Sequence, residues 1–248
     1  MIKAATPAAI RIIPTTSSTS TPLSLGFPQI DQVRSGGANT YTFTPRSTAM
    51  LSVAITPLIE GDPNVHITGP GTTPREWTSE EIGADSLAIT PSAEEVGQAF
   101  TVLVPSANQS WYTITVSETS ETSPTTLLGG LPLEASASAG TDHFFRLRVP
   151  PGLTDVVLVV TALYGDADLF VNTQEQGFYT YDDTEIEPSS TWSSQFTYGA
   201  DSVVIDSTHP SFLRAGGDYL VTVHAVRDCK FVLRGYSAVT VITLTEGV

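Results

Sequence analysis

The chain has 248 residues, 40% of them hydrophobic, which is enough to bury a packed core and argues against wholesale disorder. Its formal net charge is −15, and its 11 lysines and arginines are scattered singly, so nucleic acid is not expected as a partner and anionic membrane surfaces are poor partners. The one cysteine, Cys229, excludes a disulfide within the chain, and we interpret it as a small core residue of a strand.

Taken in chain order, the sequence divides into two domains separated and flanked by Ser/Thr-rich segments. Residues 1–21 predict a linker or the end of a preceding module, 22–118 a first domain, 119–125 a linker, 126–238 a second domain, and 239–248 a tail or linker. The longest apolar run, Val156–Leu163, is too short to span a bilayer, and the start lacks the apolar region of a signal peptide. We therefore expect a piece of a larger modular protein.

An internal repeat supports the division into two domains. At an offset of 104 positions, Gly61-Asp-Pro-Asn-Val65 aligns with Gly165-Asp-Ala-Asp-Leu169, and Tyr41 and Phe43 align with Phe145 and Leu147 without a gap. Later landmarks follow in the same order: Trp77-Thr-Ser with Trp192-Ser-Ser, Gly83-Ala-Asp-Ser with Gly199-Ala-Asp-Ser, and Phe100-Thr-Val-Leu-Val with Tyr219-Leu-Val-Thr-Val. Several landmarks in one order indicate two copies of one module.

The second copy carries an insertion, because the offset grows from 104 at Gly61/Gly165 to 115 at Trp77/Trp192. The inserted segment, Thr173–Thr191, is rich in aromatic and acidic residues. Loops carry specificity on sandwich scaffolds, so we expect the two copies to differ in function at this loop.

Both copies are dominated by short runs of alternating hydrophobicity bounded by Gly, Pro, Asp or Asn, which is typical of half-buried strands. In the second copy the predicted strands are His143–Val149, Val156–Thr161, Asp168–Asn172, Ser202–Asp206, Asp218–His224 and Phe231–Arg234. Apolar residues recur nowhere at helical spacing for three turns. The predicted fold is all-β, with two tandem antiparallel β-sandwich domains of jelly-roll-like kind.

The order of Gly165-Asp-Ala-Asp-Leu-Phe-Val171, Trp192-Ser-Ser, Gly199-Ala-Asp-Ser-Val-Val-Ile205 and Gly217-Asp-Tyr-Leu-Val-Thr-Val223 resembles the pre-peptidase C-terminal (PPC) domain. The resemblance covers nearly all of the second copy and is weaker in the first. It implies a non-catalytic β-sandwich module of secreted or surface proteins, used for secretion or attachment and in some relatives for calcium binding.

The best candidate site is the pair Asp166 and Asp168. Residues two apart on a strand point to the same face, so the two carboxylates can converge on one hard cation such as calcium. Asp182, Asp183 and Asp206 are the predicted additional metal ligands, and Asp62 and Asn64 form a weaker equivalent site in the first copy. The alternative is that Asp166 makes a turn hydrogen bond and Asp168 is a solvated residue at a strand start.

A candidate binding surface for a protein or glycan is formed by the aromatic residues Phe178, Tyr179, Tyr181 and Trp192. The alternative for Trp192, and for its equivalent Trp77, is packing on the sheet. For catalysis, the four histidines show no zinc-binding spacing, and no nucleophile elbow or nucleotide-binding glycine pattern occurs. We predict that the chain is not an enzyme.

Three hypotheses remain open. The first is a non-catalytic adhesion or structural module of a larger extracellular or cell-surface protein, calcium-stabilised in the second domain. The second is a carbohydrate-binding module, and the third is an intracellular scaffold repeat of a ciliary or cytoskeletal array.

Overall fold

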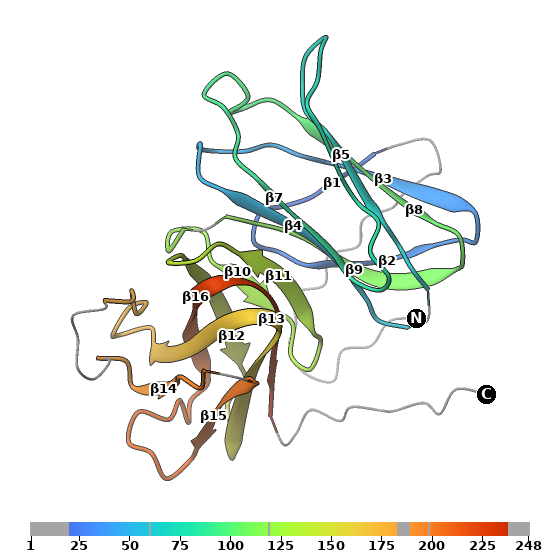
Figure 1. Ribbon diagram of the computed structural model, residues 1–248. Helices are drawn as coiled ribbons and strands as arrows, with labels where there is room; N and C mark the ends of the chain where they lie inside the picture. The colour runs from blue at the N-terminus through green and yellow to red at the C-terminus, as the bar shows by residue number, and fades with distance from the viewer. Residues whose placement is uncertain (1–19, 60, 119, 183–188, 198, 238–248) are drawn as a thin grey trace.

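The computed structural model describes residues 20–59, 61–118, 120–182, 189–197 and 199–237. In these ranges the chain forms strands and no helix, and the strands build two β-sandwiches that follow one another in sequence (Figure 1). The all-β fold class predicted from the sequence is confirmed. No helix among the described residues is long and apolar enough to cross a membrane.

The first sandwich, domain 1, packs a five-stranded sheet (β1-β3-β8-β5-β6) against a four-stranded sheet (β2-β9-β4-β7). Its strands are β1 (Thr21–Pro22), β2 (Gln29–Val33), β3 (Gly37–Phe43), β4 (Leu51–Pro57), β5 (Val65–Thr68), β6 (Glu76–Ser79), β7 (Asp85–Ile89), β8 (Phe100–Ser106) and β9 (Ser110–Glu118). Alternate residues of these strands point inward, as in β8, where Phe100, Val102 and Val104 are fully buried. Together they form one continuous hydrophobic core.

The second sandwich, domain 2, repeats this strand order with two long strands in place of four short ones. Its strands are β10 (Thr125–Leu127), β11 (Leu133–Ala137), β12 (Asp142–Val149), β13 (Asp155–Thr173), β14 (Trp192–Ser194), β15 (Ala200–Asp206) and β16 (Gly217–Tyr236). The first half of β13 pairs with β15 and its second half with β14, so this strand passes from one layer of the sandwich to the other. β16 does the same, and it pairs with β12 in one layer and with β11 in the other.

The strand register relates the two domains position by position. Ile55 pairs with Ile114 and Asp85, and Val160 pairs in the same way with Leu233 and Asp201. β4 is therefore offset from β13 by 105 positions (55 to 160), whereas the sequence predicted 104 without a gap. The prediction is wrong in this strand because, in domain 2, the connection that enters it is one residue longer and the connection that leaves it is one residue shorter, so Tyr41/Phe145 and Val65/Leu169 on either side keep the offset of 104.

Each domain begins with a short parallel edge strand, although an antiparallel sandwich was predicted. β1 pairs with β3 and β10 pairs with β12 in parallel. Between the domains the chain is fixed at Gly26, whose N–H donates to Val116 O (2.7 Å) and whose carbonyl accepts from Thr126 N (2.6 Å). Gly26 has φ +77°, and a Cβ there would lie 2.8 Å from Pro124 O, so only glycine fits this turn.

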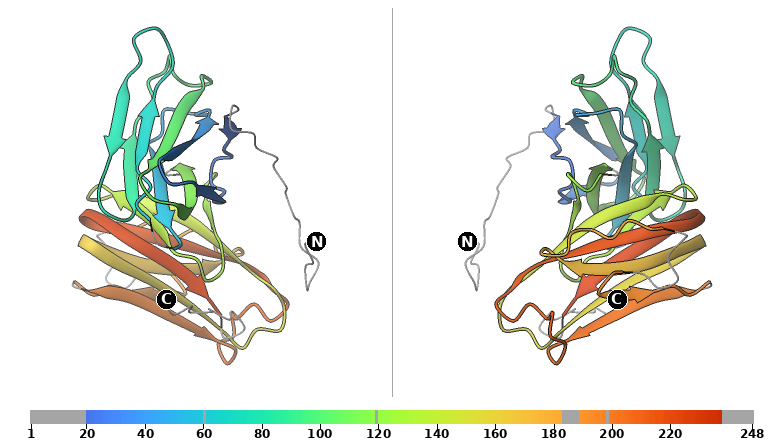
Figure 2. Two further views of the ribbon diagram at one scale, coloured as in Figure 1. Left: turned by 90° about the vertical axis from the view of Figure 1, so that its right-hand side faces the viewer. Right: turned by 90° about the vertical axis from the view of Figure 1, so that its left-hand side faces the viewer.

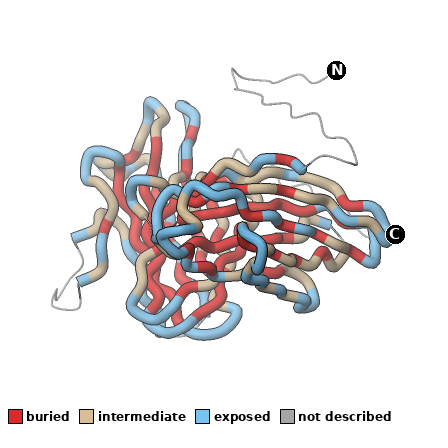
Figure 3. The backbone as a smooth tube through the Cα atoms, turned by 90° about the horizontal axis from the view of Figure 1, so that it is seen from above, coloured by how far each residue is buried: buried red, intermediate tan, exposed pale blue. Residues whose placement is uncertain are grey.

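Domain 2 sits against the outer face of the four-stranded sheet of domain 1. Figure 2 shows domain 1 (blue to green) stacked above domain 2 (yellow to red), with β11 next to β4 and β7 at the junction. Buried positions run along the strands of both domains, and exposed ones gather in the turns (Figure 3). Both faces of β4 are buried, since its inner face packs in the core through Leu51, Val53 and Ile55. Its outer face is covered at Ser52, Ala54 and Thr56.

Candidate functional site

The inserted segment of domain 2 folds back over the outer face of the sheet formed by β12, β16 and β13. Its aromatic residues pack on that face, with ring centroids 5.1 Å apart for Phe178 and Phe144 and 4.4 Å apart for Tyr179 and Phe170. Tyr181 stacks on His224 at 3.8 Å. Thr222 Oγ1 donates to the carbonyl of Tyr179 (2.6 Å). Domain 1 has no such insertion, and Leu103, at the position equivalent to Thr222, is 37% exposed.

This packing corrects part of the predicted binding surface. Tyr179 is 5% exposed and belongs to the interior, because its ring fills the space above Phe170. Trp192 is partly buried against the core of domain 2 and contacts Tyr219, just as Trp77 contacts Phe100 in domain 1. Phe178 and Tyr181 are half-buried. The insertion thus covers the outer face of the sheet formed by β12, β16 and β13. The hydrophobic periodicity of the sequence does not indicate this role.

Asp166 and Asp168 lie at the irregular middle of β13, where the strand passes between the layers, and both are 6% exposed. Burial, followed by the charges of Asp201 and Asp166, raises the pKa of Asp168 to about 7. Burial also raises the pKa of Asp166, while the Arg227 guanidinium acts in the opposite direction. The two carboxylates therefore share an acidic, desolvated site with Asp201.

Asp201 is the member of this site that sequence reasoning missed. It is 2% exposed, and its Oδ1 accepts hydrogen bonds from Ser194 Oγ (2.6 Å) and Phe196 N (2.9 Å). Asp85 of domain 1 holds Ser79 and Glu81 N in the same way. The repeated Gly-Ala-Asp-Ser motif was the available signal, since the same aspartate closes the same turn in both copies.

The remaining predicted ligands do not join Asp166 and Asp168. Asp206 lies at the opposite end of β15 from Asp201, about 16 Å along the strand, and its carboxylate accepts from Thr208 N (2.7 Å). Asp182 is exposed, and Asp183 lies outside the described residues. Within the described ranges, no group of three or more His, Cys, Asp or Glu side chains is arranged to hold a metal ion. As placed, the carboxylates do not form a calcium cage, and calcium stays a prediction from sequence.

In the weaker equivalent site of domain 1, Asp62 and Asn64 are used in hydrogen bonds that hold turns. Asp62 Oδ1 accepts from Gly83 N (2.7 Å), and the Asn64 backbone N–H donates to Pro105 O (2.9 Å). The carboxylate of Asp62 is thus used to hold the turn before β7, which is the alternative that the sequence left open for its counterpart Asp166.

The four histidines have structural surroundings. His224 Nδ1 lies 2.7 Å from Asp142 Oδ1, His66 pairs with Glu80 on the surface, and the His209 ring accepts from Ser211 N. Burial lowers the pKa of His143 to about 4, and its ring packs edge-on against Phe231. None of these contacts brings a histidine to a serine or cysteine side chain, so they contain no triad of the kind that activates a nucleophile.

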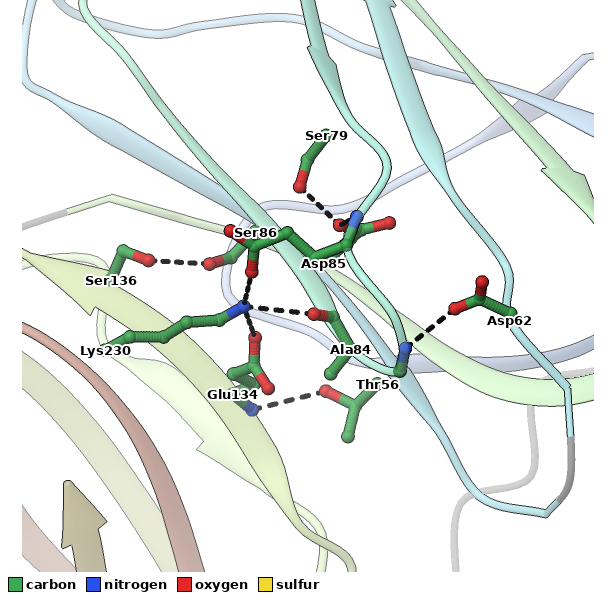
Figure 4. A network of polar contacts seen from close by, with 11 residues as sticks. Thr56, Asp62, Ser79, Ala84, Asp85, Ser86, Glu134, Ser136 and Lys230 are labelled. Carbon is green, nitrogen blue, oxygen red and sulfur yellow. Dashed lines mark hydrogen bonds and ion pairs between the residues drawn. The ribbon is translucent and has the colours of Figure 1, made fainter. Parts of the chain in front are cut away.

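A second polar cluster joins the two domains at Lys230 of β16 (Figure 4). The ammonium group reaches Glu134 Oε1 of its own domain (2.8 Å) and, across the junction, Glu81 Oε2 (2.7 Å) and the carbonyl of Ala84 (3.0 Å). The contacts to Glu81 and Ala84 are hydrogen bonds, whereas the contact to Glu134 is an ion pair in which Glu134 Oε1 has no hydrogen bond. Two neutral contacts accompany it: Ser86 Oγ lies 2.6 Å from Ser136 Oγ, and Glu134 N donates to Thr56 Oγ1 (3.2 Å).

The electrostatics of this cluster follow from burial. Lys230 is 8% exposed and Glu134 is 3% exposed. Burial tends to lower the pKa of Lys230, but the interactions with Glu134 and Glu81 outweigh this effect, and the pKa is raised. Burial raises the pKa of Glu134, with Lys230 opposing the shift. Each buried charge depends on the other for its stability, and the hydrogen bonds from Lys230 to Glu81 and Ala84 tie β16 to domain 1.

No protein-family model matches this chain, and no curated protein matches it by sequence. Among solved structures it is similar to the pre-peptidase C-terminal domain of a collagenase from Bacillus anthracis, with 11% identity, 45% of this chain and 95% of that chain covered, and a TM-score of 0.32. It is also similar to the tandem CBM22-1–CBM22-2 domains of Paenibacillus barcinonensis Xyn10C, with 8% identity, coverage of 85% and 91%, and a TM-score of 0.23. A third is the CUB1-EGF-CUB2 region of human MASP-1/3, with 5% identity, coverage of 83% and 99%, and a TM-score of 0.21. These TM-scores are low, and the two-sandwich fold rests on the strand pairing of this chain.

Proposed function

We propose that this chain is a non-catalytic structural and binding unit of a larger extracellular or cell-surface assembly, in which two β-sandwich modules are held as one rigid body. The observation that carries the proposal is the interdomain cluster at Lys230, where a buried ammonium group of domain 2 donates two hydrogen bonds to domain 1 and pairs with Glu134 of its own domain. A buried ammonium group is stable only while its partners stay in place. The contact therefore favours two domains in a fixed arrangement over two domains joined by a flexible linker.

The linker supports the same role. Its C-terminal end is fastened to domain 1 where Thr126 N donates to Gly26 O (2.6 Å), and the inserted loop reaches it where Thr180 Oγ1 donates to Glu121 Oε1 (3.1 Å). A rigid spacer sets the distance and direction between whatever its two ends hold. The PPC resemblance, the acidic composition and the Ser/Thr-rich segments support placement in a secreted or surface protein.

Rigidity is tested by the distance between spin labels on the two domains. Cysteines at the exposed positions Thr72 and Gln174, in a Cys229→Ala background, would carry the labels. A single narrow distance distribution at low protein concentration is the expected result. A broad distribution, as from a flexible linker, would contradict the proposal.

Two alternatives receive less support. A carbohydrate-binding role required the aromatic insertion as an exposed platform, whereas Tyr179 is buried and Trp192 packs on the core. A glycan array probed with the chain separates this role from that of a spacer, since a spacer is not retained by sugars. The intracellular scaffold hypothesis shares the rigid two-domain body and differs in location, which localising the parent protein in cells would decide.

A further inference from the structure

The contact between the two domains uses one surface of each. Domain 1 contributes what we call the receiving face, on β4 and β7 and the turn before β7, and domain 2 contributes the docking strip, on β11 and β16. Three pairs meet across the junction: Thr56 with the backbone N of Glu134, Ser86 with Ser136, and Glu81 with Lys230.

Because the domains are copies of one module, each also carries the surface that the other uses. In domain 2 the receiving face consists of Thr161, Ser202 and Phe196. Thr161 follows Val160 as Thr56 follows Ile55, and Ser202 pairs with Val159 as Ser86 pairs with Ala54. Phe196 occupies the place of Glu81, since the backbone N–H of each donates to the aspartate that closes the turn.

In domain 1 the docking strip consists of Ile30, Gln32 and Trp111. Gln32 pairs with Trp111 on adjacent strands, as Ser136 pairs with Lys230 in domain 2. Ile30 pairs with Thr113, as Glu134 pairs with Val232.

Both of these second surfaces are open. Ile30 is 47% exposed and Trp111 is 41% exposed, although the matching residues Glu134 and Lys230 are buried by the interdomain contact. On the receiving face of domain 2, Phe196 is 66% exposed, and Thr161 and Ser202 are exposed as well. Such large side chains leave the strip and the face with apolar area that has no partner within the described chain.

The two open surfaces match each other chemically, pair by pair. Thr161 repeats the hydroxyl acceptor of Thr56, and Ser202 can hydrogen-bond the amide of Gln32 as Ser86 does the hydroxyl of Ser136. The third pair differs in both partners. Lys230 meets Glu81 inside the chain, and Trp111 would meet Phe196 in the contact between two chains. An ion pair is replaced by an aromatic pair, with both partners changed together.

We infer that the chain associates head to tail with further copies of itself, the docking strip of domain 1 in one molecule binding the receiving face of domain 2 in the next. The contact repeats the geometry that joins the two domains within the chain. It is heterologous, so each bound copy leaves one strip and one face free, and addition continues unless the array closes into a ring. This inference names the partner of the proposed structural unit and rests on that proposed function.

The test is sedimentation velocity on the chain from micromolar to millimolar concentration. We expect concentration-dependent growth beyond the monomer. Trp111→Lys and Phe196→Glu, each alone, should weaken association by about tenfold or more, because each removes one ring of the aromatic pair and places a charge without an ionic partner in the contact. Mixing the two variants should restore association, since Lys and Glu recreate the ion pair that joins the domains inside the chain.

Leu103→Lys, on the exposed face of the other sheet of domain 1, is the matched control and should associate like the wild type. Thermal melts of each variant establish that it is folded. A wild-type chain that stays monomeric at millimolar concentration would overturn the inference, and so would association that the two variants leave unchanged. The spin-label distance within one molecule is measured separately at low concentration, so a rigid monomer that does not self-associate would sink this inference alone.

Discussion

At the scale of single residues, Asp168 makes the stability of the fold depend on pH. Its pKa is raised from 3.8 to about 7 in the folded chain, so between these values the folded protein holds a proton that the unfolded chain has lost. Stability at this site therefore falls as pH rises through this window and levels off above it. Asp168→Asn removes the ionisable group, and we expect it to gain stability relative to wild type, on the order of 1 kcal/mol, between pH 4 and pH 8.

Urea unfolding of both proteins across this range measures the difference, in which titrating groups that do not interact with Asp168 cancel. A constant difference at every pH would contradict the assignment. Adding about 2 mM calcium tests the metal prediction in the same experiment, because a site of extracellular affinity would stabilise the wild type by about 0.6–1.8 kcal/mol. Asp168→Asn should lose that gain, and equal curves with calcium and with chelator would end the calcium hypothesis.

The sequence located this residue and could not supply its surroundings. Two aspartates two positions apart on a strand were visible as a pair, but Asp201 comes from β15, and nothing local to the pair indicates which strand will lie beside it. Asp206, on the same strand, was chosen instead and lies at the wrong end, because the strand's direction and register are set by pairing partners far away in the chain. Charge clustering could be predicted, whereas its membership depends on tertiary structure.

At the scale of elements, alternation found the strands and missed their continuity. Val156–Thr161 and Asp168–Asn172 were predicted as two strands, and they are the two halves of β13, joined through register shifts rather than a loop. The Gly-Asp-Ala-Asp motif sits at this joint, where Gly165 has φ +79°. A Cβ at Gly165 would also lie 2.2 Å from Asp228 O and 2.6 Å from Cys229 Cβ on the facing part of β16.

Gly165→Ala is therefore expected to lower the free energy of unfolding by about 3 kcal/mol or more, since the methyl group meets backbone that cannot move without breaking the β13–β16 pairing. Gly152→Ala is the matched control. It has a similar φ of +84° with nothing within 4 Å of the added Cβ, so it isolates backbone strain of about 1 kcal/mol. Urea denaturation of the two variants measures the comparison. Equal losses would mean that the close approach at Gly165 is not what fixes the joint.

At the scale of the whole molecule, the two-domain body was predicted from the repeat, whereas the interface between the domains was not. Lys230 and Glu134 look like ordinary surface charges in their strands, and the first sits at the repeat position of a tryptophan. Lys230 and Glu134 are buried because domain 1 covers the docking strip on β11 and β16. A repeat shows that two modules exist, while their mutual packing depends on side chains that the copies do not share.

This packing leads to a prediction for the charges at the junction. Lys230→Met keeps the length of the side chain and removes its charge, which leaves Glu134, 3% exposed, without a cation. We expect a loss of about 3 kcal/mol in the free energy of unfolding, because an uncompensated carboxylate stays buried.

The double variant Lys230→Met/Glu134→Gln should recover most of that loss, since neither charge is then present. Glu81→Gln should lose less than about 1 kcal/mol, because the side chain of Glu81 is 68% exposed and water can replace its partner. Urea denaturation of the four proteins measures the set. If Lys230→Met and Glu81→Gln were equally mild, the ammonium group would contribute no more than a surface ion pair, and the domains would be held together by their Ser- and Thr-lined faces alone.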